Sequence, residues 1–153
     1  MSKFTFPSPV STSTPLPQLA TAMNQNMRAL ERWSDIEPDP MISFYWPADL
    51  VVVTVPIRIY LPYPCSVQSV GVMVATAPVG SDAIFDLHLD GVTMFTTQAN
   101  RPTIPDGGYY SGYMRPDIIQ VPFGSYLTVA VDQVGAGTAG SYPLFVIRLG
   151  KYQ

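Results

Sequence analysis

From residue 41 onward, hydrophobic and polar side chains alternate with a period of two, which is the pattern of half-buried β-strands. The clearest case is residues 51–61, where every odd position is apolar and the even positions include Thr54, Pro56 and Arg58. We expect one long half-buried strand here. Because proline cannot donate to a strand ladder, Pro56 places this strand at a sheet edge or at a bulge.

The same alternation recurs along the rest of the chain. It predicts strands at residues 67–77, 85–89, 127–131 and 145–149. In the second of these, Phe85, Leu87 and Leu89 should face the core, with the polar residues between them facing outward. Asp90-Gly91 follows directly and suits a tight hairpin, because both of its residues tolerate positive φ. We therefore predict a mainly β protein: an antiparallel β-sandwich or jelly-roll-like domain of about eight short strands, with no helix between them for a parallel βαβ arrangement.

Residues 18–33, QLATAMNQNMRALERW, form the one segment with a convincing helical pattern. Apolar residues fall in a heptad register over two repeats, with one asparagine at a core position: Leu16, Leu19, Met23, Asn26, Leu30 and Trp33. One interpretation is an amphipathic helix docked on its own domain. We favour a self-associating stem, because an acidic, proline-containing linker at residues 34–41 separates the helix from the sandwich. A core asparagine is also a known device for fixing register and oligomer state.

Residues 1–17 are rich in proline, serine and threonine, so this segment should be extended and unable to fold alone. Phe4, Phe6 and Val10 are the apolar residues that such an arm offers to a groove on another protein. A disordered tail is the alternative. The expected organisation is thus an anchoring arm (1–17), a helical stem (18–33), a linker (34–41) and a β-sandwich domain (42–153).

Composition narrows the classes of partner. Hydrophobic residues make up 47% of the chain and charged residues only 12%, a surface chemistry that suggests coverage by other subunits. The net charge of −3, with single scattered lysines and arginines, argues against nucleic-acid binding. The longest apolar stretch, residues 50–61, is interrupted by Thr54, Pro56 and Arg58, so we expect no membrane span.

Three patterns invite a chemical interpretation. Residues 135–140, GAGTAG, match a dinucleotide-binding glycine motif, but a strand-like segment follows instead of the required helix, so we expect a flexible hairpin loop. Asp86, His88 and Asp90 share one strand face, as metal ligands do, although same-face neighbours on a straight strand are too far apart to share one ion. We interpret them as a polar outer face. With one cysteine, Cys65, and one histidine, the sequence predicts no catalytic, metal or cofactor site.

The segment at residues 107–114, GGYYSGYM, is the most interesting surface candidate. Tyrosine, serine and glycine are enriched in recognition loops, where rigid amphipathic rings stand on a permissive backbone. Tyr109, Tyr110 and Tyr113 therefore suit stacking on a sugar or on a protein. The favoured interpretation is that they are strand residues covering a subunit interface.

The whole layout resembles small virion proteins of tailed bacteriophages. The resemblance rests on the helix ending in ALERW and on SVGVMVATAPVGSDAIFDLHLDGVTMF, RPTIPDGG and YLTVAVDQVGAG in the body, and it covers about residues 18–149. It implies a non-enzymatic homotrimer in the virion, assembled in the host cytoplasm: a capsid decoration, head-fibre or tail-fibre protein. Its N-terminus would be anchored to other virion proteins of the capsid or tail. A tail-associated adhesin that binds host-surface carbohydrate is the alternative.

Overall fold

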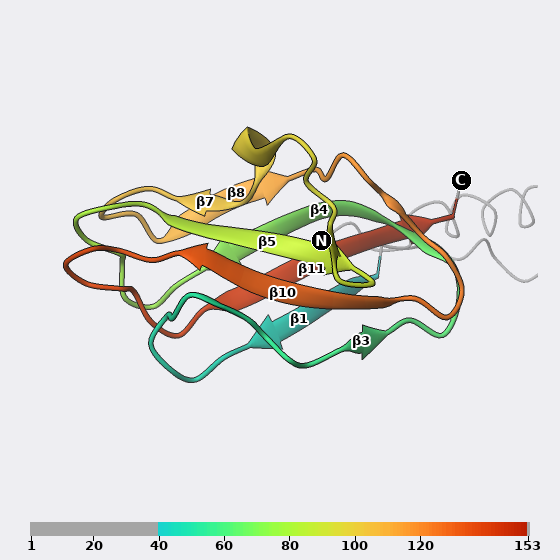
Figure 1. Cartoon of the computed structure of the whole chain (residues 1–153), viewed down its shortest axis with the longest axis horizontal. Helices are drawn as coiled ribbons and strands as arrows, with labels where there is room; N and C mark the ends of the chain where they lie inside the picture. The colour runs from blue at the N-terminus through green and yellow to red at the C-terminus, as the bar shows by residue number, and fades with distance from the viewer. Residues whose placement is uncertain (1–39, 153) are drawn as a thin grey trace, which may run out of the picture. The chain divides into compact units, whose positions relative to one another are not determined.

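The computed structural model describes residues 40–152. The predicted arm and stem lie outside the described residues, so the expectations for both segments stay predictions. Within the described part the chain is mainly β and folds as two antiparallel sheets, which confirms the predicted fold class (Figure 1). No helix in this part is long and apolar enough to cross a membrane.

The first sheet has five strands. Its order is β1–β11–β4–β8, and β9 also pairs with β4. The strands are β1 (Met41–Tyr45), β4 (Cys65–Met73), β8 (Tyr110–Met114), β9 (Gln120–Val121) and β11 (Leu144–Lys151). β11 pairs along its whole length with β4 and also pairs with β1, so it is an interior strand of this sheet.

The second sheet has six strands in the order β2–β10–β5–β6, with β3 paired to β10 and β7 paired to β5. The strands are β2 (Val53–Thr54), β3 (Ile59–Tyr60), β5 (Ala83–Leu89), β6 (Val92–Thr93), β7 (Thr103–Ile104) and β10 (Tyr126–Gln133). A short 3-10 helix, η1 (Gln98–Asn100), precedes β7. The described part thus has eleven strands instead of about eight, because five of them are only two residues long.

The core lies between the two sheets. Phe85 of β5 and Phe145 of β11 meet edge to face across this space, with ring centroids 5.5 Å apart. Leu87, Leu127 and Ile147, from β5, β10 and β11, are fully buried beside them. The inward positions predicted for these residues from the period-two pattern are confirmed, and Leu89 is half-buried.

The predicted Asp90-Gly91 turn is confirmed. Asp90 has φ 52° and Gly91 φ 86°, so both residues occupy the left-handed region that this hairpin requires. β5 and β6 pair on either side of the turn, with His88 opposite Thr93. The Asp90 carboxylate also accepts the Tyr126 N–H at 3.0 Å, which ties the turn to β10.

The prediction of one long strand over residues 51–61 is wrong. The segment forms two short strands, β2 and β3, which both pair with β10. Pro56 lies between them, where the chain leaves the ladder, and Val51 and Ile57 are 51% and 52% exposed instead of facing the core. The expected edge position is confirmed, because β2 and β3 lie at one edge of the six-stranded sheet.

Candidate functional site

The outer face of the five-stranded sheet carries a row of apolar side chains. Tyr45, Leu144, Met73 and Tyr110 lie opposite one another on β1, β11, β4 and β8. Residues that are directly opposite on paired strands project from the same face. Tyr45 and Tyr110 are exposed at the two ends of the row, and Leu144 and Met73 are half-buried between them. We call these four residues the apolar row.

Tyr113 lies beside the apolar row on the same face. It is directly opposite Gly71 of β4, and its ring is 5.8 Å from the Tyr110 ring in an edge-to-face arrangement. The guanidinium of Arg148 is 5.9 Å from the centroid of the Tyr113 ring. Partial burial raises the pKa of Tyr110, and the neighbouring Tyr113 phenol adds to this increase.

A bulge in β8 positions the two tyrosines. The register between β4 and β8 shifts between Gly71 and Met73, and Gly112 has φ 75° at this point. The Val72 N–H donates to the Ser111 hydroxyl oxygen at 2.9 Å, which replaces a backbone acceptor of the ladder. The extra residue lets Tyr110 and Tyr113 emerge from one face although they are three residues apart.

Of the three predicted recognition tyrosines, the structure brings together Tyr110 and Tyr113. Both belong to an edge strand, which corrects the description of this segment as a loop and agrees with the favoured interpretation that they are strand residues. Tyr109 is exposed just before the strand, and its carbonyl accepts the Val74 N–H at 3.0 Å. That a subunit or a sugar covers these rings stays a prediction.

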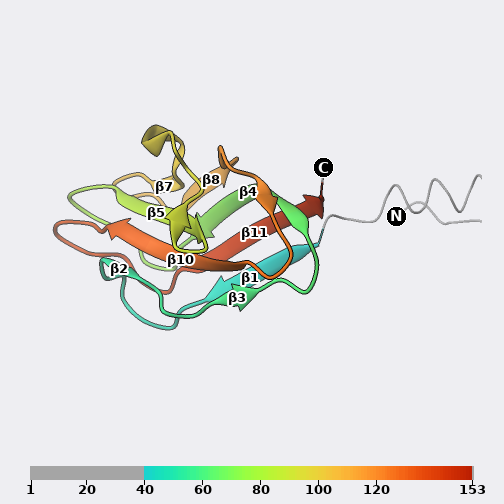
Figure 2. The same cartoon turned by 45° about the vertical axis from the view of Figure 1, so that its right-hand side comes forward.

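A groove of about 370 Å³ opens at the sandwich edge where β1 and β2 lie. Figures 1 and 2 both place β1 and β3 at this edge of the domain. Nine residues line the groove, none of them charged: Phe44, Tyr45, Trp46, Pro47, Val51, Val53, Val55, Pro56 and Ile57. We call it the edge groove. The sequence analysis did not predict this groove. One signal was present: Val51 and Val52 are adjacent apolar residues, and they break the alternation expected of a half-buried strand.

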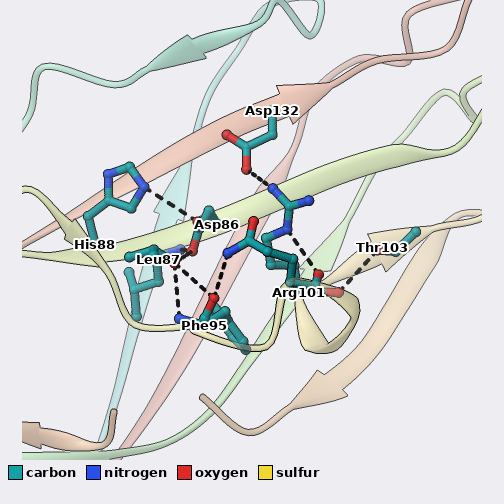
Figure 3. Close-up of polar contacts among 9 residues, drawn as sticks. Asp86, Leu87, His88, Phe95, Arg101, Thr103 and Asp132 are labelled. Carbon is teal, nitrogen blue, oxygen red and sulfur yellow. Dashed lines mark hydrogen bonds and ion pairs between the residues drawn. The ribbon is translucent and has the colours of Figure 1, made fainter. Parts of the chain in front are cut away.

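Asp86 lies at the centre of a polar network on the six-stranded sheet (Figure 3). Its Oδ1 accepts the Leu87 N–H at 2.7 Å and the Thr93 hydroxyl at 2.9 Å, and its Oδ2 is 3.5 Å from Nε2 of His88. Asp86 alternates with the inward-facing Phe85 and Leu87, as predicted, but the polar outer face expected there is covered at this residue, which is only 5% exposed. Burial raises the pKa of this carboxyl, against the lowering effect of the two hydrogen bonds.

Arg101 and Asp132 form an ion pair next to Asp86 (Figure 3). Arg101 also donates through Nε to the Gln98 carbonyl of η1, at 3.1 Å. The ion pair between Arg101 and Asp132 anchors the connection between η1 and β7 to the end of β10.

The three residues considered as metal ligands do not converge. Asp86 and His88 are in contact, whereas Asp90 points its carboxylate to the backbone of Tyr126. Among residues 40–152, no three histidine, cysteine, aspartate or glutamate side chains are grouped so that they could hold a metal ion. Cys65 is buried in β4, and its burial raises the thiol pKa, which disfavours the reactive thiolate.

Residues 135–140 connect β10 of one sheet to β11 of the other, so the expected hairpin loop is wrong. The Gly137 N–H donates to the Val79 carbonyl at 2.7 Å, and the Val79 N–H donates to the Thr138 carbonyl at 2.9 Å. A Cβ on Gly135 would lie 2.0 Å from the Thr138 carbonyl oxygen. Close backbone approach therefore accounts for the glycine, and β11 follows where a dinucleotide site would need a helix.

Comparison of the chain with protein-family models, with curated proteins and with solved structures finds no match. The apolar row, the Tyr110 and Tyr113 rings and the edge groove are the features of the described residues that bear on function.

Proposed function

We propose that this chain is a non-enzymatic structural subunit of a virus particle, a trimeric capsid decoration, head-fibre or fibre-like protein that is attached through its N-terminal arm. The observation that carries the proposal is the apolar row, which runs across four strands from Tyr45 to Tyr110 on an outward face. A contiguous apolar face of this kind is typical of protein–protein contact surfaces.

The chemistry of the described residues also favours assembly over catalysis. The buried carboxylate of Asp86 is used by Leu87, Thr93 and His88, and no charged side chain lines the edge groove. Neither feature offers a nucleophile beside a base, the arrangement that an activated side chain requires.

The trimer is tested by measuring the mass of the purified full chain by light scattering at micromolar concentration. We expect a mass that corresponds to a multiple of three chains. Leu30→Asp should reduce the number of chains per particle, because it puts a charge into the proposed stem seam. Arg28→Asp is the matched control, since residue 28 is outside the seam register. A monomer in the wild type would overturn the trimer.

A second function, host-surface carbohydrate binding, is favoured by one observation. Tyr110 and Tyr113 present two exposed rings at an edge-to-face angle of 79°, and exposed aromatic rings are platforms on which sugar faces stack. Glycan binding by the wild type should be lost in Tyr110→Ala/Tyr113→Ala and kept in Tyr63→Ala, which removes an exposed tyrosine elsewhere. Equal binding by both variants would exclude this function.

A further inference from the structure

β1 is an edge strand, and no other strand of residues 40–152 covers its open side. Among the described strands it pairs with β11 only, and all five of its residues are in register without a bulge. Its sequence, MISFY, contains no charge and no proline, the two features with which proteins usually block an open edge. Such a strand is a template for another strand.

The register tells which backbone groups of β1 are open. The Trp46 N–H donates to the Pro143 carbonyl at 3.0 Å, and the Leu149 N–H donates to the Pro40 carbonyl at 2.8 Å. In an antiparallel pair, the residues that bond to the partner alternate along the strand. The even residues from 40 to 46 therefore point their backbone groups at β11. Met41, Ser43 and Tyr45 point their N–H and C=O groups away from it.

The side chains of β1 add a second feature at this edge. Ile42 and Phe44 pack against the core with their inner faces and are only half-buried, and Phe44 also lines the edge groove. A strand added beside β1 would continue the five-stranded sheet past its edge. Its inward side chains would then lie over the edge groove and cover it.

The strand that fits best is β1 itself. When two copies run antiparallel about Ser43, each open residue meets an open residue: Ser43 meets Ser43 of the partner subunit, and Met41 meets Tyr45 of the partner subunit. The pairing supplies about six backbone hydrogen bonds, because each open residue gives one donor and one acceptor. Ile42 then faces Phe44 of the partner subunit on the groove side, an aromatic–aliphatic cross-strand pair.

The lack of charged side chains at this edge suits a second copy of the chain as the partner of β1. A two-fold contact brings each charged side chain near its own equivalent, so charged edges repel themselves. Neither β1 nor the lining of the edge groove carries a charged residue. The contact would also cover Met41 and Tyr45, which are 64% and 55% exposed in the single chain.

We propose that β1 pairs antiparallel with β1 of a second copy about a two-fold axis at Ser43, joining two five-stranded sheets into one and closing the edge groove. This contact is separate from the proposed stem, so it would join two monomers or two trimers. It goes beyond the proposed function, because it stands or fails whether or not the stem forms a trimer.

The first test compares Ser43→Asp with Ser43→Asn in the full chain. The aspartate variant places two like charges opposite each other on the axis, whereas the asparagine variant changes the size in the same way without charge. We expect light scattering to give half the wild-type mass for Ser43→Asp and the unchanged mass for Ser43→Asn. The dissociation constant of the β1 contact in Ser43→Asp should rise by at least about tenfold. Equal masses for the wild type, Ser43→Asp and Ser43→Asn would overturn the pairing. The same result is expected if a different protein, and not a second copy, occupies the edge.

This test separates the two proposals. A change from six chains to three supports both, and a change from two chains to one supports the β1 contact but overturns the trimer. A trimer whose mass Ser43→Asp leaves unchanged supports the stem and overturns the β1 contact. Circular dichroism of each variant establishes that the fold is kept.

The second test is covalent and does not depend on tolerance of a charge. Ser43→Cys places two thiols opposite each other on the axis, at a Cα separation of about 5.5 Å that a disulfide spans. Met41→Cys is the matched control, because residue 41 meets residue 45 instead of itself. Mild oxidation should yield covalent dimers of Ser43→Cys and far less of Met41→Cys, with the buried Cys65 present in both. No dimer, or equal yields from the two variants, would overturn the register.

Discussion

The ring of Tyr113 lies where a side chain on Gly71 would project. The two residues are directly opposite on β8 and β4, and a Cβ on Gly71 would be 2.9 Å from two of the ring carbons. Gly71 therefore provides the space in which Tyr113 covers β4 on the outer face of the sheet.

Gly71→Ala should lower the free energy of unfolding by about 1–3 kcal/mol, the usual cost of inserting a methyl group into packed surroundings. Removing the ring as well, in Gly71→Ala/Tyr113→Ala, should recover part of that loss, because most of the crowding comes from the ring. Urea denaturation of both single variants and the double variant measures the coupling. Strictly additive effects would show that the two positions do not interact.

Phe145→Ala should lower the free energy of unfolding by about 3–5 kcal/mol, because it leaves a cavity between the two sheets. The ring is 1% exposed and meets both Phe85 and Phe44. Phe123→Ala is the control: that ring is 75% exposed, so its loss should change stability by less than about 0.5 kcal/mol. Thermal or chemical denaturation that gave similar losses for both variants would contradict the assigned core.

Asp86→Asn should make the protein more stable at neutral pH. In the folded chain, burial raises the pKa of Asp86 above its ordinary value of 3.8, so folding favours the protonated carboxyl. The wild type therefore loses stability as pH rises from this value through the folded-state pKa, and the neutral amide does not. The amide oxygen still accepts from Leu87 and Thr93. Denaturation between pH 3 and 7 checks this, and an advantage that persisted at pH 3 would contradict the cause.

Asp117→Asn should loosen the turn at residues 96–100. The Asp117 carboxylate accepts the Thr97 N–H at 2.6 Å, the Thr96 hydroxyl at 3.1 Å and the Asn100 amide at 3.4 Å. The first of these bonds is the main cause of the lowered pKa of Asp117, so the bonds favour the ionised form. We expect a smaller protection factor against hydrogen exchange at the Thr97 amide in the variant, and also in the wild type as pH falls through the folded-state pKa. Unchanged exchange in the variant would refute the role of the charge.

The strands around the core could be predicted from the sequence because alternation is a local property. Phe85, Leu87, Leu127 and Ile147 are buried where the pattern places them. Asp90-Gly91 was equally predictable, since few residue pairs accept two positive φ angles.

The features that prediction missed depend on contacts between distant segments. Asp86 is buried because the chain returns after the hairpin and Thr93 bonds to its carboxylate, which alternation along one strand does not reveal. The segment at residues 51–61 fails as a single strand because its apolar side chains serve both the core and the edge groove. Two roles stay predictions: the stem that sets the number of subunits, which light scattering of Leu30→Asp and Arg28→Asp tests, and the anchoring arm. The stem residues are Leu16, Leu19, Met23, Asn26, Leu30 and Trp33, and the arm residues are Phe4, Phe6 and Val10.

The interior position of β11 has a consequence for synthesis on the ribosome. β1 and β4 are made first, but each pairs with β11, the last described strand in chain order. Until residues 144–151 have emerged, β4 can pair only with β8 and β9 in this sheet. β1, and the edge of β4 that β11 later covers, are open to other nascent chains during this time. The first sheet is therefore completed late, and a slow step in translating residues 144–151 would extend the period in which the nascent chain is prone to aggregate.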